Sequence, residues 1–397
     1  MKRKIIILQS FIFVVASIYA QQQRQDVVPD FREKSGAELF FYRLGRIIDN
    51  ALMKGLDTAY LGLPEKGWTV AFVNDYVGLN TTMNFQDINY FNSSTNIKFH
   101  STPTIALGVA AGYRTLAFNY TWDVFSPRSG KFKFELLNKS WGIEFMRHVN
   151  DNIVGSIETL GQTPLQVNKK EIKFLTSYLS LYYVFGGERY SMTAHRRMAY
   201  VQKKSAGAFY LFGQYIGSKI ETASDELVRE VGDLKEIEMH QGAVGAGYGY
   251  NYTPNGGKFL LHVSAAPMLV FFNRSVLTFD MNLPIDDNTS VVLPIDYKVV
   301  PKVPFYVTGT ARVAINWNIN EWIYLMAYST FHNFRFKEKE RIEMKSNTWE
   351  WSANVMFGVR FGMDKKKSVK MLEDFDAHSN ERKRDMIDWV EKLLNRP

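Results

Sequence analysis

The chain has 397 residues, a formal net charge of +8, 15% aromatic residues and no cysteine. Without cysteine it forms no disulfide, thiolate metal site, catalytic thiol or lipid-modified N-terminal cysteine. No run of Lys and Arg is interleaved with aromatic residues, so nucleic acid is not expected as a partner.

The N-terminus has the parts of a secretory signal peptide. Lys2, Arg3 and Lys4 form a basic start, residues 5–18 are mostly apolar, and a cleavage position follows Ala20. No later stretch holds about 18 consecutive apolar residues, so no transmembrane helix is expected. An exported, aromatic-rich chain without such a helix is typical of a β-barrel in the outer membrane of a Gram-negative bacterium.

Residues 21–66 are expected to form a periplasmic segment that contains a helix. Ser35 and Glu38 fit a capping box, which predicts a helix over residues 36–53. Apolar residues follow at helical spacing: Phe40, Leu44, Ile47, Ile48 and Ala51. A helix with one apolar face is expected to pack on the end of the barrel, with entry into the lumen as the alternative.

Residues 349–361 have the clearest strand pattern. Alternate positions are apolar: Trp349, Trp351, Ala353, Val355, Phe357, Val359 and Phe361. The positions between them include Glu350 and Arg360. Since side chains alternate across a strand, one face is apolar and carries aromatic residues at both ends, as a lipid-facing barrel strand does.

The same period of two residues recurs in eleven earlier segments: 68–80, 97–113, 114–123, 131–137, 141–148, 171–185, 204–219, 240–252, 258–274, 305–318 and 321–336. The fold class is therefore predicted as all-β, an antiparallel transmembrane barrel of about twelve strands over residues 67–362, with short flanking amphipathic helices. Residues 363–397 are expected to form a periplasmic tail with a helix.

The connections decide the strand count. Short turns fall near residues 113, 138, 255 and 319, and long polar links fall at 85–95, 149–170, 220–239, 275–301 and 337–346. Barrels have short periplasmic turns, long external loops and an even number of strands, so residues 186–203 are predicted to be a periplasmic excursion that does not span. Both termini are then periplasmic.

Six landmarks resemble a known family: residues 57–60 (DTAY), 107–109 (LGV), 112–114 (GYR), 202–207 (QKKSAG), 245–252 (GAGYGYNY) and 358–361 (GVRF). Together they resemble the bacterial outer-membrane family catalogued as domain of unknown function 4421, over about residues 57–361. The resemblance implies an outer-membrane barrel and supplies no activity.

Polar residues opposite the aromatic faces are predicted to line the lumen. They are Asp123, Lys131, Lys133, Glu135, Glu144, Arg312, Asn316, Glu350 and Arg360. If these charges pair across a barrel of twelve strands, little conductance is expected. An unpaired basic ring would instead give a weak anion preference.

His262 and Ser264 form the sharpest enzymatic fragment. Residues two apart share a strand face, so an imidazole and a hydroxyl can meet, but a third residue must orient the imidazole. No Asn or Asp stands near them in this strand, although a neighbouring strand could supply one, and both side chains are expected to point inward. The seven histidines form no ligand pair, and neither a metal nor another cofactor is expected.

The densest basic cluster comprises His195, Arg196, Arg197, Lys203 and Lys204. Charge runs usually face water, so a solvated periplasmic turn is favoured over an anion contact, a lipopolysaccharide-phosphate contact or a lumen plug.

The leading functional interpretation is a non-enzymatic outer-membrane barrel, either a narrow transport channel or a structural or partner-binding component. Its expected partners are outer-membrane lipid, lipopolysaccharide and envelope proteins. The first alternative is a lipid-modifying barrel enzyme, a phospholipase or a lipopolysaccharide-modifying enzyme that uses His262 and Ser264. The second alternative is a soluble periplasmic β-protein.

Overall fold

The computed structural model describes Arg32 and residues 35–381, except 88–93, 103, 127, 162, 197–199, 231–232, 255, 287–288, 300–305, 340–341, 363–366 and 368. The predicted signal peptide and the apolar positions of the predicted tail helix, 386–394, lie outside the described residues.

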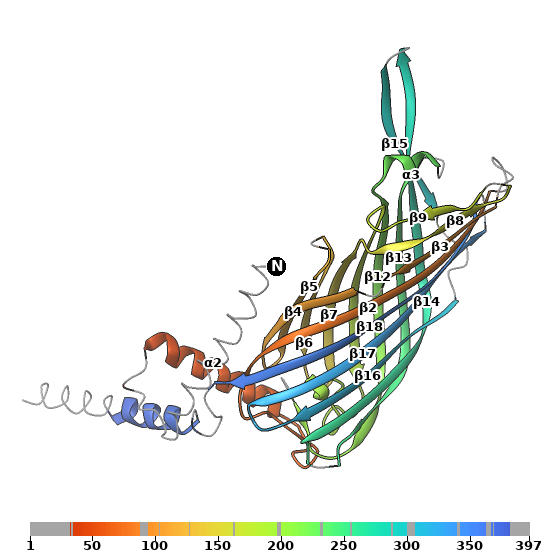
Figure 1. The fold of residues 1–397 in the computed structure, drawn as a ribbon. Coiled ribbons are helices and arrows are strands. Elements are labelled where there is room, and N and C mark those ends of the chain that lie inside the picture. The colour runs from red at the N-terminus through yellow and green to blue at the C-terminus, as the bar shows by residue number, and fades with distance from the viewer. Residues whose placement is uncertain are drawn as a thin grey trace, which may run out of the picture.

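Twelve antiparallel strands close into a barrel, as predicted (Figure 1). The strands are β2 (Trp68–Asp87), β4 (Thr104–Tyr113), β5 (Leu116–Asp123), β6 (Gly130–Leu137), β7 (Trp141–Asn150), β10 (Ile172–Val184), β12 (Ala206–Thr222), β13 (Leu234–Tyr252), β14 (Phe259–Asp286), β16 (Tyr306–Asn318), β17 (Ile323–Lys339) and β18 (Ile342–Phe361). Each strand pairs with its neighbour, and β18 pairs with β2 along its whole length, from Ile342 opposite Asp87 to Phe361 opposite Trp68. This last pairing removes the free edges of the sheet.

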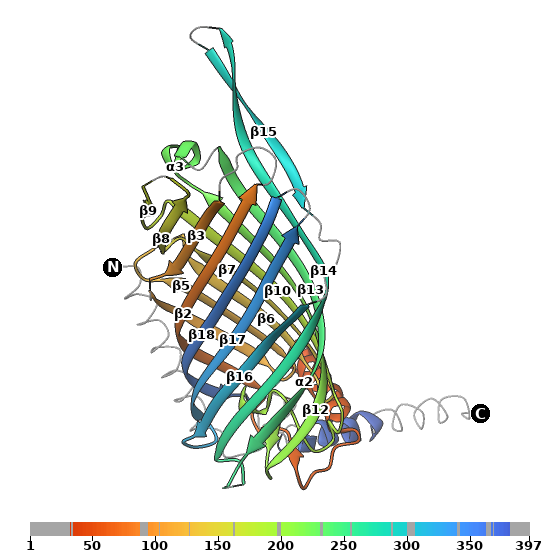
Figure 2. The same cartoon turned by 90° about the vertical axis from the view of Figure 1, so that its right-hand side faces the viewer.

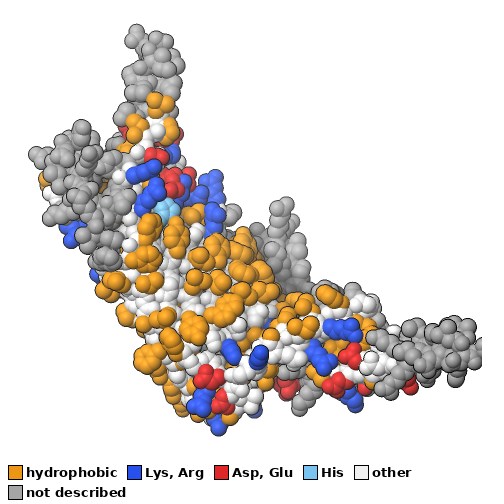
Figure 3. Space-filling view, turned by 180° about the vertical axis from the view of Figure 1, so that it is seen from behind, with side chains coloured by type: hydrophobic (Ala, Val, Ile, Leu, Met, Phe, Trp, Pro, Cys, Tyr) orange, Lys and Arg blue, Asp and Glu red, His pale blue; other side chains and the backbone are white. Residues whose placement is uncertain are grey.

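The two faces of the barrel wall follow the alternation in the sequence. On β5, Phe118 and Tyr120 are 47% and 53% exposed, whereas Asn119 and Thr121 between them are buried. Hydrophobic side chains form a broad band across the face of the barrel that Figure 3 shows. None of the described helices is long and apolar enough to cross a membrane. The alternation along the strands gives the barrel wall the apolar outer face of a transmembrane β-barrel.

One end of the barrel, here called the hairpin end, is more structured than predicted. β3 (Ser94–Ser101) pairs with the upper part of β2, and β8 (Ile153–Thr159) and β9 (Leu165–Val167) extend this sheet. Residues 97–113 are therefore two strands and not one, and proline at 103, which has no backbone N–H to donate, separates them in the sequence.

At the hairpin end, two segments that were predicted to be long polar links contain strands instead. Residues 149–170 contain β8 and β9, and residues 275–301 contain the end of β14 and β15 (Thr289–Val299), which pair as a hairpin. Figure 2 shows this hairpin rising beyond the barrel above the short helix α3 (Asp225–Glu230). The period of two is present in the sequence of the hairpin, where Leu277, Phe279 and Met281 alternate with polar residues, but the prolines at 284 and 294 and the acidic residues between them favour a loop.

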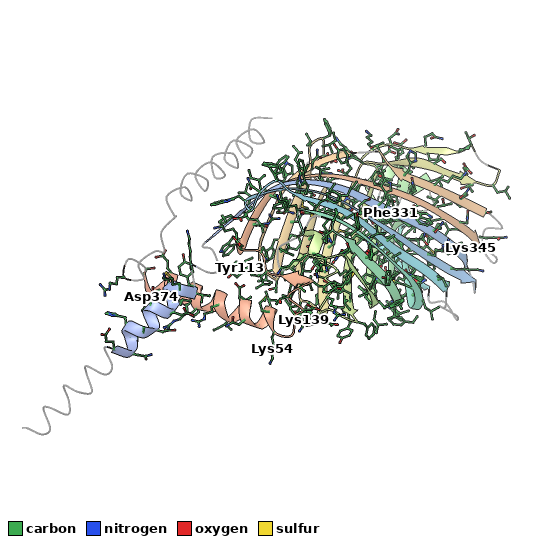
Figure 4. All side chains as sticks on the ribbon, turned by 90° about the horizontal axis from the view of Figure 1, so that it is seen from below. Lys54, Tyr113, Lys139, Phe331, Lys345 and Asp374 are labelled. Atoms are coloured by element: carbon green, nitrogen blue, oxygen red, sulfur yellow. The ribbon has the colours of Figure 1, made fainter. Side chains whose placement is uncertain are left out.

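The opposite end, here called the turn end, carries the short connections and both described ends of the chain. Helix α2 (Gly36–Met53) lies there with the predicted capping box, Ser35 accepting from the Glu38 amide and Glu38 from the Ser35 amide. Residues 369–381 form a second helix, and Arg43 of α2 binds Asp376 of it at 3.0 Å. Figure 4 shows Lys54 and Lys139 near this end, Asp374 on the second helix, and Lys345 at the far end of the barrel.

Candidate functional site: the lumen and its plug

The nine residues predicted to line the lumen are all buried, at 8% exposure or less. A central group joins three of the strands. Arg312 of β16 donates from Nη1 to Glu144 Oε1 at 3.0 Å and from Nη2 to Glu144 Oε2 at 2.8 Å. Lys133 Nζ lies 3.3 Å from the same carboxylate and 2.9 Å from Glu135. A bidentate pair that is also bound by a second cation fixes the side chains across the lumen.

Two more lumen carboxylates are also paired. Lys131 contacts Asp75 of β2, to which Thr121 also donates at 3.4 Å. Tyr178 donates to Glu350 at 2.5 Å, and His148 Nδ1 lies 3.4 Å from that carboxylate. The charges of both signs therefore compensate each other inside the barrel, and they form no basic ring.

The remaining three predicted residues lie outside this central group. Asp123 caps the turn that follows β5 by accepting from the Ser126 amide, and it also binds Asn152. Asn316 accepts from Asn318 at 2.9 Å, and the Arg360 guanidinium stacks over the Tyr324 ring, 4.3 Å from its centroid.

The lumen has little free volume. A cavity beside Lys133, Glu144 and Arg312 measures about 20 Å³, which is the scale of one water molecule. Towards the hairpin end the interior is filled by an apolar cluster that includes Met83, Phe174 and Leu277. These two described layers of the lumen are therefore packed with side chains.

Residues 186–196 and 200–202, here called the plug, lie between β10 and β12 in the chain and enter the lumen from the turn end. Tyr190, Ser191 and Ala194 are buried, and His195 of the short helix η2 (Ala194–Arg196) is 0% exposed. The prediction that 186–203 does not span is confirmed, but the prediction of a solvated turn is wrong for His195. Burial and the neighbouring His262 lower the pKa of His195 well below its usual value.

Glycines on β13 make room for the plug. A Cβ on Gly249 would collide with the Tyr190 hydroxyl, and one on Gly247 would collide with the ring of Tyr210. Both glycines are buried on the inward face of the strand. The alternating glycines of 245–249 were the sequence signal for a close approach inside the lumen, because a glycine within a strand often marks such a contact.

A hydrogen-bonded chain joins the plug to the barrel wall. Asn251 of β13 lies opposite His262 of β14, and its Oδ1 is 2.8 Å from His262 Nδ1. His262 Nε2 is 3.1 Å from Ser264 Oγ, and the His195 ring stacks on His262 with centroids 5.0 Å apart. The inward direction of His262 and Ser264 is as expected, and the neighbouring strand supplies the third residue.

The N-terminal segment holds the plug from outside. β1 (Leu61–Gly62) pairs with β11 (Val201–Gln202), and Arg189 binds Asp57 at 3.0 Å. Lys203, just beyond the plug, donates from Nζ to the Thr58 carbonyl oxygen at 2.9 Å. Two landmarks that are far apart in the sequence, residues 57–60 and 202–207, therefore lie next to each other, and their contacts hold the plug in place.

The landmark at residues 112–114 (GYR) attaches α2 to the barrel. Arg114 Nε lies 2.7 Å from Asp49 Oδ1, and Arg114 also donates to the Pro64 carbonyl oxygen. Tyr113 packs so closely against Gly45 that a Cβ there would lie 2.5 Å from its hydroxyl. As predicted, α2 packs on the barrel end and does not enter the lumen.

Among the described side chains, no group of three or more His, Asp or Glu is placed to hold a metal ion. The two histidines that the fold brings together, His195 and His262, stack face to face.

Comparison with solved structures returns other barrels at low identity. The outer membrane protease OmpT from Escherichia coli is 8% identical and has a TM-score of 0.34, with 76% of this chain and 98% of that chain covered. The translocator domain of the autotransporter NalP from Neisseria meningitidis is 11% identical and has a TM-score of 0.32, with 82% and 97% covered. OprG from Pseudomonas aeruginosa is 11% identical and has a TM-score of 0.27, with 75% and 98% covered.

Such identities concern the fold alone, and no curated protein matches the sequence. The family model described as a domain of unknown function, DUF4421, matches residues 55–361. This span confirms the resemblance given by the six landmarks. The chain belongs to the DUF4421 family.

Proposed function

We propose that this protein is a closed outer-membrane barrel which, with its plug in place, is non-enzymatic and has a structural or partner-binding role. The observation that carries the proposal is the central group of Arg312, Glu144 and Lys133, with its cavity of about 20 Å³. An apolar core on one side of this group and the plug on the other leave no free path through the described interior. For the barrel to act as a narrow transport channel, the central group, the apolar core and the plug would all have to move.

We also propose that the turn end faces the periplasm. Short connections and both described chain ends gather there, whereas the long hairpin of β14 and β15 stands at the opposite end. The second helix and α2 would then be available to periplasmic envelope proteins, while the barrel exterior contacts phospholipid and lipopolysaccharide.

Planar-bilayer recording tests the closed state, with an open porin as the positive control. The purified barrel is expected to give no stepwise current. Currents of porin size from the wild-type chain would overturn the proposal.

A single cysteine introduced in β15 tests the orientation, because the chain has no other. An impermeant maleimide is expected to label it on intact cells, and a cysteine in the 138–140 turn is expected to react only after the outer membrane is permeabilised. The reverse pattern would overturn the orientation.

A further inference from the structure

His262 links two polar side chains in the arrangement used for nucleophilic catalysis. Its Nδ1 is 2.8 Å from Asn251 Oδ1, and its Nε2 is 3.1 Å from Ser264 Oγ. A nucleophile, a base within hydrogen-bond reach of it and a third group that orients the base are the recognisable parts of an activated serine.

The hydrogen bonds of Asn251 determine which nitrogen of His262 carries the proton. The Asn251 Nδ2 group donates to the Ser191 carbonyl oxygen at 2.8 Å and to Gln202 Oε1 at 3.0 Å. Its Oδ1 therefore faces His262 and accepts from Nδ1–H. Nε2 is left with a lone pair that accepts from the Ser264 hydroxyl, which is the tautomer a general base needs.

The plug covers this group of three. Gly249 pairs with Ser264 in the register, and the space that a side chain would fill there is taken by the Tyr190 hydroxyl. His195 covers the His262 ring, and Ser264 is only 3% exposed. Both covering side chains belong to the plug, so its withdrawal would open the space beside Ser264.

We propose that Ser264, His262 and Asn251 form a masked acyl-transfer site that acts on carboxylic esters once the plug withdraws. Ser264 and His262 are the catalytic residues, and Asn251 is a positioning residue. Because both catalytic side chains point into the lumen, the ester arrives in water from the turn end and not from the bilayer. This activity goes beyond the closed-barrel role.

In the acyl-transfer step, Ser264 Oγ bonds to the ester carbonyl carbon and its proton passes to His262 Nε2. The ester C–O bond then breaks, and the same proton moves to the leaving alkoxide. Water repeats the two steps on the acyl-serine and releases the carboxylic acid.

A fluorophosphonate probe measures the reactivity of Ser264, and a cysteine substitution measures access to it. The plug is opened by Tyr190→Gly with His195→Gly, and heat-modified mobility on gels shows that the barrel has folded. In this opened background, Ser264→Cys is expected to react with a small maleimide, and the native Ser264 is expected to be phosphonylated, with the site identified by mass spectrometry. With the plug left intact, Ser264→Cys is expected to resist the maleimide and the native Ser264 is expected to resist phosphonylation.

Matched variants separate catalysis from anchoring. In the opened background, labelling is expected to vanish in Ser264→Ala and to slow by about 100-fold in His262→Phe. Asn251→Asp is expected to move the pH midpoint of labelling to higher pH, because a carboxylate stabilises the imidazolium. A mere anchor for the plug would not show this shift.

Two results would overturn the proposal. One is an opened barrel in which the cysteine at 264 reacts with maleimide but the native serine is not phosphonylated. The other is a folded, opened barrel in which that cysteine stays protected, since the plug would then not be what masks the site. Neither result bears on the conductance test of the closed barrel.

Discussion

Arg114, in the first short turn, binds Asp49 on α2 at 2.7 Å, and the two side chains are only 4% and 10% exposed. Burial of both charges makes the pair costly to break, because removal of one partner leaves the other charge without compensation. This contact fixes the direction in which α2 leaves the barrel.

Asp49→Ala is expected to lower the free energy of unfolding by about 3–5 kcal/mol, because it leaves Arg114 buried and unpaired. Urea titration in detergent measures the change. Arg43→Ala, which breaks the half-exposed pair with Asp376, is the control and is expected to cost about 0–1 kcal/mol. Equal effects of the two variants would contradict the assignment.

Arg312 and Glu144, the ion pair within the central group, should depend on each other for their contribution to stability. Glu144→Ala is expected to destabilise the barrel by about 3–5 kcal/mol, whereas Glu144→Leu with Arg312→Met is expected to lie much closer to wild type, since no buried charge is then left alone. A double-mutant cycle measures the coupling. Additive effects would show that the two side chains do not share their stabilisation.

Gly249→Val should loosen the plug, because the new side chain occupies the position of the Tyr190 hydroxyl. Faster hydrogen exchange in residues 189–196 and faster protease cleavage there are the expected readouts. Gly213→Ala on β12 is the matched control, since no atom outside its immediate chain neighbours lies within 4 Å of its new Cβ. Unchanged protection in Gly249→Val would contradict the contact.

The lipid-facing side of β18 should be sensitive to charge according to depth. Val355 lies between the aromatic ends of the strand and is 44% exposed, so Val355→Arg is expected to cost about 2–4 kcal/mol. Trp349→Arg, nearer the hairpin end, is expected to cost about 0–1 kcal/mol for the charge itself. Refolding into lipid vesicles measures both, and equal costs would place the membrane elsewhere on the barrel.

Acid should weaken plug insertion through His195. Its pKa is lowered by burial and by His262, with Arg312 acting in the same direction and Glu144 opposing it. The inserted plug therefore binds fewer protons than the released plug below pH about 6.5, the usual pKa of the imidazole. Insertion is at full strength above that pH and weakens by up to about 1.4 kcal/mol for each unit below it.

Hydrogen exchange of the plug between pH 7.5 and 5, corrected for intrinsic rates, measures this dependence. His195→Phe is expected to flatten it because the ring is retained and the titration is lost. An equally steep profile in that variant would assign the effect to another group.

The barrel and α2 could be predicted because their signals are local. A period of two over residues 349–361 and a capping box at Ser35 and Glu38 are set by neighbours in the chain, and α2 begins and ends at the predicted residues. The strand count could be predicted as well, because barrels have an even number of strands and residues 186–203 therefore had to be a segment that does not span.

The contacts of the plug could not be predicted because they depend on register between strands. Asn251 meets His262 only through the pairing of β13 with β14, and Tyr190 meets Gly249 only after the plug has entered the lumen. His195 was expected in water since its basic neighbours dominate the local pattern. The long hairpin of β14 and β15 was not predicted although its residues alternate, because the prolines at 284 and 294 and the nearby acidic residues favour a loop.

The pairing of β18 with β2 has a consequence for assembly. The hydroxyls of Thr81 and Thr348 meet at 3.1 Å although 267 positions separate them in the chain. Contacts of such high contact order form late, because most of the loop-closure entropy is lost before they are made. We expect the seam between the first and last strands to close last in folding, so that the open sheet leaves the plug a lateral route to its site until then.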